Sequence, residues 1–164
     1  MRFRKTAIAI IVNDNKILFI KRDNIPTIAE PDKWQLPGGH LEEGETPIKA
    51  LKRELVEEVS YSPKKIHYIG SLKNKVREVS IFWSYVDKNE IERFKLGPLE
   101  GQEIKFMTVE DALNKRLTSN VKLYLSSYKD IIKKHLYDKT TPDIDELKQN
   151  TKFIRLLFLK LFNL

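Results

Sequence analysis

Residues 38–61 read GGHLEEGETPIKALKRELVEEVSY, and this stretch decides the fold. The glycine pair at its start allows the backbone to turn sharply and to expose its amides and carbonyls. Thr46 is a suitable N-cap, and Pro47 suits the first turn of a helix. Apolar side chains then recur at helical spacing, at Ile48, Leu51, Leu55 and Val59. We therefore expect a helix over residues 46–59 whose apolar face packs on a sheet.

A different face of this helix carries three carboxylates, Glu54, Glu57 and Glu58, which we call the glutamate cluster. Carboxylates this close repel one another unless a cation lies among them. Oxygen donors of high negative charge suit a hard divalent ion, Mg²⁺ or Mn²⁺, which also binds phosphate oxygens. Arg53 can pair with Glu57 or with Glu45 in the preceding loop. A solvated acidic face is the alternative, but the glycine pair, the capped helix and the register of the arginine favour a metal site.

The stretch is similar to the signature of the Nudix hydrolases, G-x5-E-x7-R-E-U-x-E-E-x-G-U. The matching residues are Gly39, Glu45, Arg53, Glu54, Leu55, Glu57 and Glu58. The flanks resemble the MutT-like branch of this family in an opening hairpin, in WQLPGG before the signature and in EGQEIKFM after the strands. The resemblance extends from about residue 6 to residue 113 and does not cover the C-terminal part of the chain.

One position departs from the family pattern. Ser60 stands where the signature has a glycine, which normally ends the helix in a left-handed conformation. Serine can adopt this conformation at a cost of roughly 1 kcal/mol. We therefore expect an altered helix end rather than a lost metal ligand, although the departure leaves room for a weakened enzyme.

The resemblance implies hydrolysis of a nucleoside diphosphate linked to a further group X, with Mg²⁺ or Mn²⁺ as cofactor. It implies that the glutamate cluster holds the metal together with the Gly38 carbonyl. It also implies that Arg53 and Glu45 orient the helix and its loop. A bound metal ion would neutralise phosphate oxygens and lower the pKa of a water molecule that attacks phosphorus.

A general base is also required. In the MutT-like branch, a glutamate in the loop before the last core strand approaches the metals, and the matching residue is Glu100. The resemblance therefore implies Glu100 as a metal ligand and as the base. Glu103 is the second candidate, and Glu57 or Glu58 is the alternative within the signature. A solvated loop carboxylate is the competing interpretation of both Glu100 and Glu103.

Substrate contacts are expected at the sheet end near the signature. Arg22 ends the second strand, and its guanidinium suits polyphosphate oxygens, with a surface charge as the alternative. Gly39 is a second candidate for substrate binding. Four apolar side chains are candidates for packing on a base, with core packing as the favoured interpretation of each: Leu36, Trp34, Trp83 and Phe106.

The rest of the chain predicts strands and helices that mix without regular alternation. Strands are expected over residues 6–13, 16–22, 34–36, 65–73, 78–87 and 103–108. Asp14 and Asn15 join the first two in a hairpin, residues 37–39 end the third, and residues 91–100 form a loop. Helices are expected over residues 109–116, 120–137 and 143–163. With the resemblance, this pattern indicates an α+β protein with the Nudix fold, a mixed β-sheet sandwiched between helices (α/β/α), and extra C-terminal helices.

We expect a Nudix hydrolase domain over residues 1–118 and a C-terminal helical extension over residues 119–164. The last helix is apolar almost all round, so it must be covered. Packing on the domain, or on the second subunit of a homodimer, is the favoured interpretation. The alternative is an interfacial membrane helix whose cations contact anionic lipid, namely Lys152, Arg155 and Lys160.

The composition excludes several kinds of site. The chain of 164 residues has no cysteine, and therefore no disulfide framework and no thiolate ligand or nucleophile. Its formal net charge of +7 favours anionic partners. Residues 39–61 carry three cations and six glutamates, so the remainder carries +10. No basic stripe alternates with aromatic residues, so nucleic acid is not an expected partner.

A nucleoside triphosphate, including oxidised forms, is the preferred substrate, cleaved to the monophosphate and pyrophosphate. A dinucleoside polyphosphate or a nucleotide sugar is the alternative substrate, because substrate choice lies in loops outside the signature. A non-catalytic nucleotide-binding module is the alternative function. No segment reaches the roughly 18 apolar residues of a membrane-spanning helix, and no cleavage site follows the apolar residues 7–12, so we expect a cytoplasmic protein.

Overall fold

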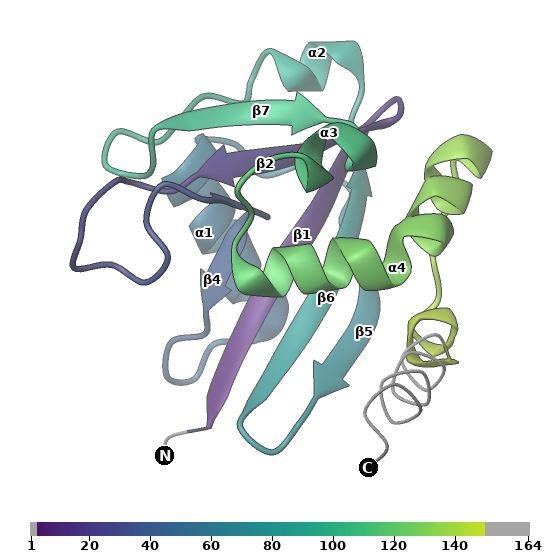
Figure 1. Cartoon of the computed structure of the whole chain (residues 1–164), viewed down its shortest axis with the longest axis horizontal. Helices are drawn as coiled ribbons and strands as arrows, with labels where there is room; N and C mark the ends of the chain where they lie inside the picture. Colours follow the sequence, from purple (N-terminus) through teal and green to yellow (C-terminus); the bar gives the residue numbers. More distant parts are fainter. Residues whose placement is uncertain (1–2, 150–164) are drawn as a thin grey trace.

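A computed structural model describes residues 3–149. Its strands form one mixed sheet, shown in Figure 1: β1 (Arg4–Asn13), β2 (Lys16–Lys21), β3 (Trp34–Gln35), β4 (Gly38–His40), β5 (His67–Lys73), β6 (Arg77–Tyr85) and β7 (Glu103–Met107). The helices are α1 (Pro47–Val59), α2 (Lys88–Ile91), α3 (Val109–Leu113) and α4 (Ser119–Asp138). Residues 144–149 are also helical.

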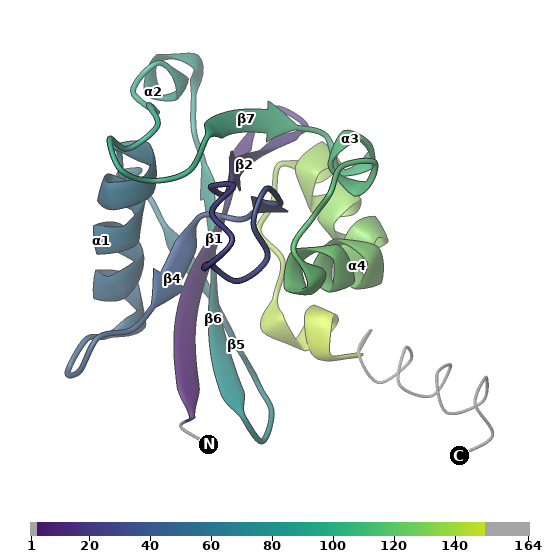
Figure 2. The ribbon, with the colours of Figure 1, turned by 60° about the vertical axis from the view of Figure 1, so that its left-hand side comes forward.

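The strand order is β3-β2-β1-β6-β5, with β4 paired to β1 and β7 paired to β2. β1 and β6 run parallel from the Arg4–Arg77 pair to the Val12–Tyr85 pair, and the other pairs are antiparallel. Figure 2 shows α1 on one face of the sheet and α3 and α4 on the other. The expected mixed sheet between helices is therefore confirmed.

Two apolar clusters fill the two sides of the sheet. Side chains of a strand point alternately to opposite faces. Accordingly Ile11 lies in the cluster beneath α1, whereas Ile10 and Val12 lie in the cluster beneath α4. From α1, the predicted apolar face contributes Leu51, Leu55 and Val59, which are all fully buried. From α4, the side chains buried in this cluster are Val121, Leu125, Tyr128, Ile132 and Leu136.

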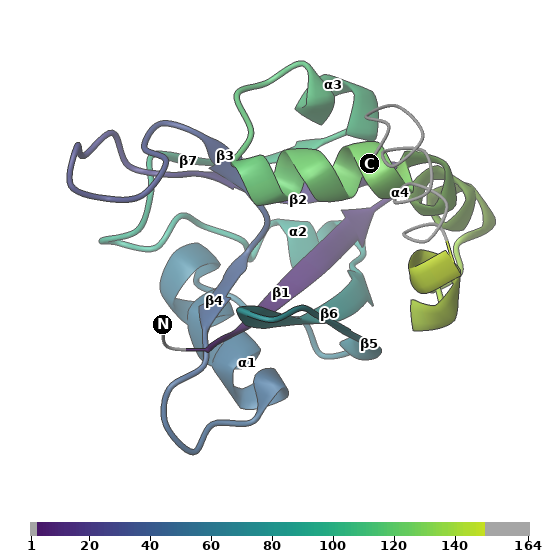
Figure 3. The same cartoon turned by 60° about the horizontal axis from the view of Figure 1, so that its bottom comes forward.

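The glycine pair is a strand rather than the turn that the sequence predicts. Gly38 adopts φ +123°, and a Cβ at this position would lie 2.1 Å from the Ala7 carbonyl oxygen. Without a side chain, the backbone of β4 can pair with β1 in the register Ile8–Gly38 and Ala7–Gly39. The missing Cβ thus brings the backbone close to a neighbouring strand, which places β4 against α1 (Figure 3).

The two ends of α1 differ from the expected caps in one respect. Thr46 precedes the helix in an extended conformation, but its side chain makes no capping hydrogen bond. Ser60 ends the helix in the left-handed conformation, with φ 54°, and its N–H donates to the Val56 carbonyl at 3.1 Å. The serine therefore takes the backbone conformation expected of the signature glycine.

A short helix within the chain segment after β6 was not expected. Asp87 caps α2, its side chain accepts the Glu90 N–H, and the Glu90 carboxylate accepts the Asp87 N–H. Such a capping box stabilises even a single helical turn. Residues 92–100 then form the expected loop.

The segment after α4 packs on the same sheet. Ile144 lies against Gly70 of β5, and Leu147 is buried in the cluster beneath α4. The rest of the predicted last helix, including Lys152, Arg155 and Lys160, lies outside the described residues. Within residues 3–149, no helix is both long and apolar enough to span a membrane.

Candidate active site

Arg53 fastens the loop before α1 to the helix itself. Its Nε donates to Glu45 Oε1 and its Nη2 to Glu45 Oε2, both at 3.1 Å. Its Nη1 donates to Glu54 at 3.0 Å and to Glu57 at 3.2 Å, and its Nη2 also donates to the His40 carbonyl at 3.1 Å. The hydrogen bonds from Arg53 lower the pKa of Glu45. Both expected partners of the arginine are thus engaged at once.

Glu58 is the buried member of the glutamate cluster, with 6% of its surface exposed. Its Oε2 accepts the Gly38 N–H at 2.8 Å, and its Oε1 accepts a hydrogen bond from Gln35 Nε2 at 3.1 Å. The pKa of Glu58 is raised to about 8, mainly by burial and also by the charges of Glu54 and Glu100, against the effect of the Gly38 hydrogen bond. The protein therefore places a carboxyl group where a negative charge is disfavoured.

Gly39 allows the sheet to approach Glu54. A Cβ at Gly39 would lie 2.4 Å from the Glu54 carboxylate, so only glycine leaves room for this side chain as it stands. Burial raises the pKa of Glu54, Arg53 opposes the shift, and the charges of Glu57 and Glu100 add to it. Gly38 and Gly39 thus lie against two different glutamates of the cluster, Glu58 and Glu54.

The loop that carries Glu100 is fixed at both ends. Gly97 donates its N–H to the Glu58 carbonyl at 2.8 Å, and a Cβ on Gly97 would lie 1.8 Å from the Glu57 carbonyl oxygen. At the other end, the Gly101 N–H donates to Asp23 Oδ2 at 3.1 Å. Glu100 is held near enough for its charge to raise the pKa values of Glu54 and Glu58.

The second candidate base lies elsewhere on the sheet. Glu103 is the first residue of β7 and pairs in register with Lys21 of β2. It is solvent-exposed, whereas the charge of Glu100 is among the main causes of the raised pKa values of Glu54 and Glu58. The geometry therefore favours Glu100 over Glu103 as the loop carboxylate that joins the cluster.

Arg22 is linked to the glutamate cluster through the side chain of Gln35. Its Nη1 donates to Gln35 Oε1 at 2.7 Å, and its Nε donates to the Ala29 carbonyl at 3.1 Å. Gln35 in turn donates to Glu58. Sequence reasoning missed Gln35, although its place between the apolar Trp34 and Leu36 was a usable signal, because neighbouring side chains of a strand point to opposite faces.

Leu36 belongs to the core and not to the surface of the site. Its side chain is 4% exposed and lies in the cluster beneath α4, together with Trp34 and Trp83. Phe106 is partly buried in the cluster beneath α1. The structure therefore favours packing for these side chains and gives the assignment of Leu36 to substrate binding no support.

The carboxylate oxygens of the glutamate cluster are ligands that a hard cation prefers, but the side chains that carry them do not converge on one point. Within residues 3–149, no group of three or more acidic or histidine side chains is already arranged to hold a metal ion. The reason is visible in the contacts: Arg53 holds Glu54 and Glu57, while Glu58 turns toward Gly38 and Gln35. Burial raises the pKa values of Glu54 and Glu58, and a divalent ion would offset the cost of burying these charges, so the residues fit such an ion.

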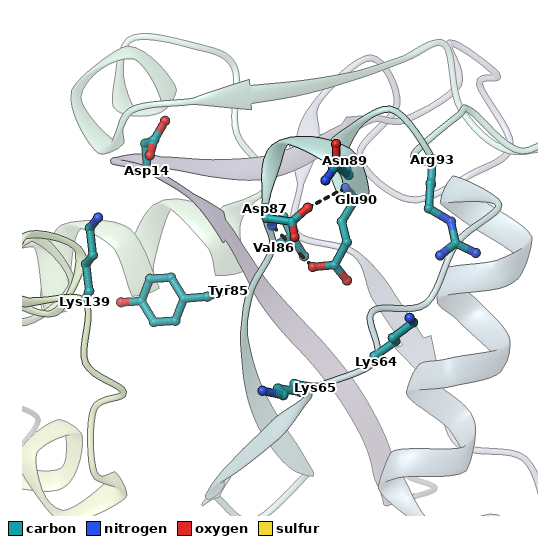
Figure 4. A pocket seen from close by; sticks show the side chains of 10 residues that line it. All are labelled: Asp14, Lys64, Lys65, Tyr85, Val86, Asp87, Asn89, Glu90, Arg93 and Lys139. Carbon is teal, nitrogen blue, oxygen red and sulfur yellow. Dashed lines mark hydrogen bonds between the residues drawn. The ribbon is translucent and has the colours of Figure 1, made fainter.

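A separate pocket of about 810 Å³ opens where the chain leaves β6, and none of its lining residues belongs to the glutamate cluster (Figure 4). The lining residues are Asp14, Lys64, Lys65, Tyr85, Val86, Asp87, Asn89, Glu90, Arg93 and Lys139. Three of them are acidic, and two of these, Asp87 and Glu90, form the capping box of α2, where Glu90 also accepts the Tyr61 hydroxyl at 2.9 Å. The pocket thus combines four cations with three acidic residues, of which Asp14 lies outside the capping box.

A match over the whole domain identifies the family of this chain. A NUDIX domain family model matches residues 2–127. The chain belongs to the Nudix family. The 8-oxo-dGTP diphosphatase of Escherichia coli (strain K12) is 32% identical over 111 residues, which cover 66% of this Nudix chain and 83% of the relative.

Other Nudix relatives match a shorter part. An RNA pyrophosphohydrolase of Halorhodospira halophila (strain DSM 244 / SL1) is 37% identical over 76 residues, which cover 46% of this chain and 39% of the relative. Two further curated relatives are matched over 20% and 27% of their length, so the chain spans well under half of these proteins.

Solved structures confirm the Nudix fold. The NUDIX domain of Shewanella oneidensis NrtR, in complex with ADP ribose, superposes with a TM-score of 0.63 at 17% identity. The superposition covers 80% of this chain and 89% of that one. The family signature and the fold therefore agree, and the residues of the signature lie together in space.

Proposed function

We propose that this protein is a metal-dependent pyrophosphohydrolase that cleaves a nucleoside triphosphate, including oxidised forms, to the monophosphate and pyrophosphate. The observation that carries the proposal is that three carboxyl groups lie close enough to influence one another. Glu54 and the loop residue Glu100 both raise the pKa of the buried Glu58, which is about 8. The similarity to an 8-oxo-dGTP diphosphatase over most of that enzyme's length supports the triphosphate as substrate.

The metal would be held by the glutamate cluster, Glu100 and the Gly38 carbonyl. When bound, a divalent ion neutralises phosphate oxygens and lowers the pKa of water. Arg53 keeps the loop before α1 in register through Glu45, so the cluster stays in position. Arg53 also holds one carboxylate oxygen each of Glu54 and Glu57, and the second oxygen of each would serve the metal.

Glu100 is the proposed general base. Its loop is fixed to α1 and to Asp23, which holds the carboxylate beside the cluster but on a separate element. In this role the Glu100 carboxylate accepts a proton from the attacking water. Arg22 is proposed to bind substrate phosphate oxygens from the Gln35 side, and Gly39 leaves space there for Glu54. Glu57 and Glu58 are the alternative bases.

An RNA 5′ end is the second candidate substrate, because a relative that is 37% identical over 76 residues is an RNA pyrophosphohydrolase. A dinucleoside polyphosphate or a nucleotide sugar stays an alternative small substrate. The non-catalytic binding module loses its main support, since Ser60 adopts the left-handed conformation that the signature requires. The homodimer and the cytoplasmic location stay predictions.

The test is a product analysis with a panel of nucleoside triphosphates, oxidised triphosphates, dinucleoside polyphosphates, nucleotide sugars and 5′-triphosphate RNA, each with Mg²⁺ and Mn²⁺. We expect monophosphate and pyrophosphate from a triphosphate, and loss of turnover in folded Glu58→Gln and Glu100→Gln variants. The control is Glu43→Gln, an exposed carboxylate outside the cluster. Nucleotide binding without turnover of any panel member would instead establish a binding module.

A further inference from the structure

A side chain outside the signature links the two charged parts of the site. Gln35 accepts a hydrogen bond from Arg22 Nη1 at 2.7 Å and donates one to Glu58 Oε1 at 3.1 Å. A guanidinium has only donors, so the amide oxygen must face Arg22, and the amide nitrogen then faces Glu58. Gln35 therefore has a fixed direction, with its oxygen toward the cation and its nitrogen toward the acid.

The backbone around Gln35 is fixed independently of these bonds. β3 pairs with β2 in the register Ile20–Gln35, and the Trp34 N–H donates to the Arg116 carbonyl at 2.8 Å. The Trp34 carbonyl accepts the Thr118 N–H at 2.9 Å. Trp34 and Leu36 on either side are buried beneath α4, so the Gln35 side chain points to the opposite face, toward α1.

Gln35 completes the hydrogen bonding of a buried carboxylate. The Gly38 N–H holds one oxygen of Glu58 at 2.8 Å, and the Gln35 amide holds the other. Two donors from different strands fix both the position and the plane of the carboxylate. A donor beside a metal-binding carboxylate typically changes metal affinity or activity by roughly 10- to 100-fold when it is removed.

We propose that Gln35 is a positioning residue, which fixes the Glu58 carboxylate for the metal and, with its amide oxygen, fixes Arg22 for the substrate. The inference rests on the proposed function, since it assigns Glu58 to the metal and Arg22 to the phosphates. It goes beyond the signature, because Gln35 lies on β3 and matches none of the signature positions.

The experiment compares Gln35→Met with two other variants in the full chain. Gln35→Met keeps the length of the side chain and removes both hydrogen bonds. Gln102→Met is the matched control, because Gln102 donates to the Arg22 carbonyl and to Asp32 and does not contact the cluster. Arg22→Met removes the cation and leaves the amide donor to Glu58 in place.

Mn²⁺ affinity is measured by calorimetry without nucleotide, together with kcat, KM and the thermal unfolding midpoint. We expect Gln35→Met to weaken Mn²⁺ binding by about tenfold or more and to lower kcat. Arg22→Met is expected to raise KM and to keep the Mn²⁺ affinity within about threefold of the wild type. Gln102→Met is expected to match the wild type in both Mn²⁺ affinity and KM. A merely structural role would lower the unfolding midpoint of Gln35→Met and leave its Mn²⁺ affinity unchanged.

The outcomes separate the two proposals. Unchanged Mn²⁺ affinity in folded Gln35→Met overturns the positioning role, even if the wild type hydrolyses nucleotides. Weakened Mn²⁺ affinity supports it, even if no nucleotide of the panel is cleaved and the proposed function fails. Should Gln35→Met not fold, Gln35→Asn applies the same criterion, because its amide is one methylene too short to span Arg22 and Glu58. A wild type that binds no Mn²⁺ overturns both proposals.

Discussion

Glu58 is a carboxyl group whose folded environment favours its protonated form. Burial raises its pKa to about 8, against 4.5 for a solvated glutamate. The folded state therefore binds this proton more tightly than the unfolded state does. The resulting contribution to stability is fully present below about pH 4.5 and is lost as the pH rises through 8.

Because this contribution to stability falls as the pH rises, it predicts how the stability of the metal-free protein depends on pH. We expect its unfolding midpoint in EDTA to rise as the pH is lowered from 8.5 to 6, and Glu58→Gln to remove most of this slope. The carboxylates whose pKa values are lowered, such as Glu30 and Glu45, are ionised in both states over this range and add no slope. The measurement is thermal unfolding by circular dichroism at several pH values.

Glu43→Gln is the control for the pH experiment, because Glu43 is exposed and lies outside the cluster. It should keep the wild-type slope. A slope that survives in Glu58→Gln would assign the pH dependence to another group.

The residues of the signature could be placed from the sequence because their spacing is local. Arg53 and the glutamate cluster lie on one helix, where helical periodicity brings them together, and Glu45 lies in the loop directly before that helix. Gln35 could not be placed this way. Its contact with Glu58 spans 23 residues and depends on how β3 lies against α1. The orientation of Glu54 and Glu57 toward Arg53 likewise depends on competition among charges.

At the level of elements, the loop of Glu100 depends on a close backbone approach. Gly97 lies where a Cβ would be 1.8 Å from the Glu57 carbonyl oxygen, and this oxygen belongs to the helix backbone and cannot move freely. We predict that Gly97→Ala displaces the loop, destabilises the protein by roughly 1–3 kcal/mol and lowers kcat. Urea unfolding and steady-state kinetics measure the two effects.

Pro98→Ala is a suitable control for the loop, since Pro98 is exposed next to Gly97. It should retain kcat. If Gly97→Ala kept the wild-type kcat as well, the position of this loop would not matter for catalysis, and Glu100 would be a poor candidate for the base.

The end of α1 gives a prediction of the opposite sign. Ser60 has φ 54°, a conformation that costs a residue with a Cβ roughly 1 kcal/mol. We predict that Ser60→Gly raises the unfolding midpoint by about 2–4 °C and leaves kcat unchanged. Ser60→Ala, which removes the hydroxyl but keeps the Cβ, should give no gain. A gain of the same size in both variants would trace the effect to the hydroxyl group.

Some helices and strands could be predicted from the sequence, and others could not. The hairpin of β1 and β2 follows from two β-rich apolar runs on either side of the Asp14–Asn15 turn, and α1 follows from its apolar spacing. The single turn of α2 was missed, although Asp87 and Glu90 carry the spacing of a capping box. The pairing of β4 with β1 could not be predicted, since it depends on space left by the missing Cβ of Gly38.

The arrangement of the whole molecule depends on contacts between distant segments. The resemblance to the Nudix family implied the layers, but the sequence patterns did not predict the parallel pairing of β1 with β6, which joins residues about 73 positions apart. The same holds for the segment after α4. Tyr85 on β6 lies 2.8 Å from the carbonyls of His135 and Thr140, and Glu146 lies 2.7 Å from His135 Nε2. These contacts fix the chain beyond α4 to the sheet.

Charge is also distributed over the whole molecule, and it bears on how a polyphosphate arrives. The chain carries +7 although its signature segment is acidic, and the ion pairs among residues 3–149 do not involve Lys64, Lys65 or Lys139. These three lysines line the pocket of Figure 4, away from the glutamate cluster. Unpaired cations attract an anionic substrate over a distance and raise its association rate without contacting it.

We therefore predict that reversing all three lysines to glutamate, which changes the net charge from +7 to +1, lowers kcat/KM by about tenfold at low salt and leaves kcat unchanged. The association rate enters kcat/KM but not kcat, so the two constants should separate. Raising the salt concentration should reduce the wild-type kcat/KM toward that of the variant, since salt screens charges over about 10 Å. Replacing the same lysines by arginine keeps the charge and should preserve kcat/KM. A fall in kcat in the reversed variant would show instead that the pocket acts on the chemical step, through contact rather than through long-range attraction.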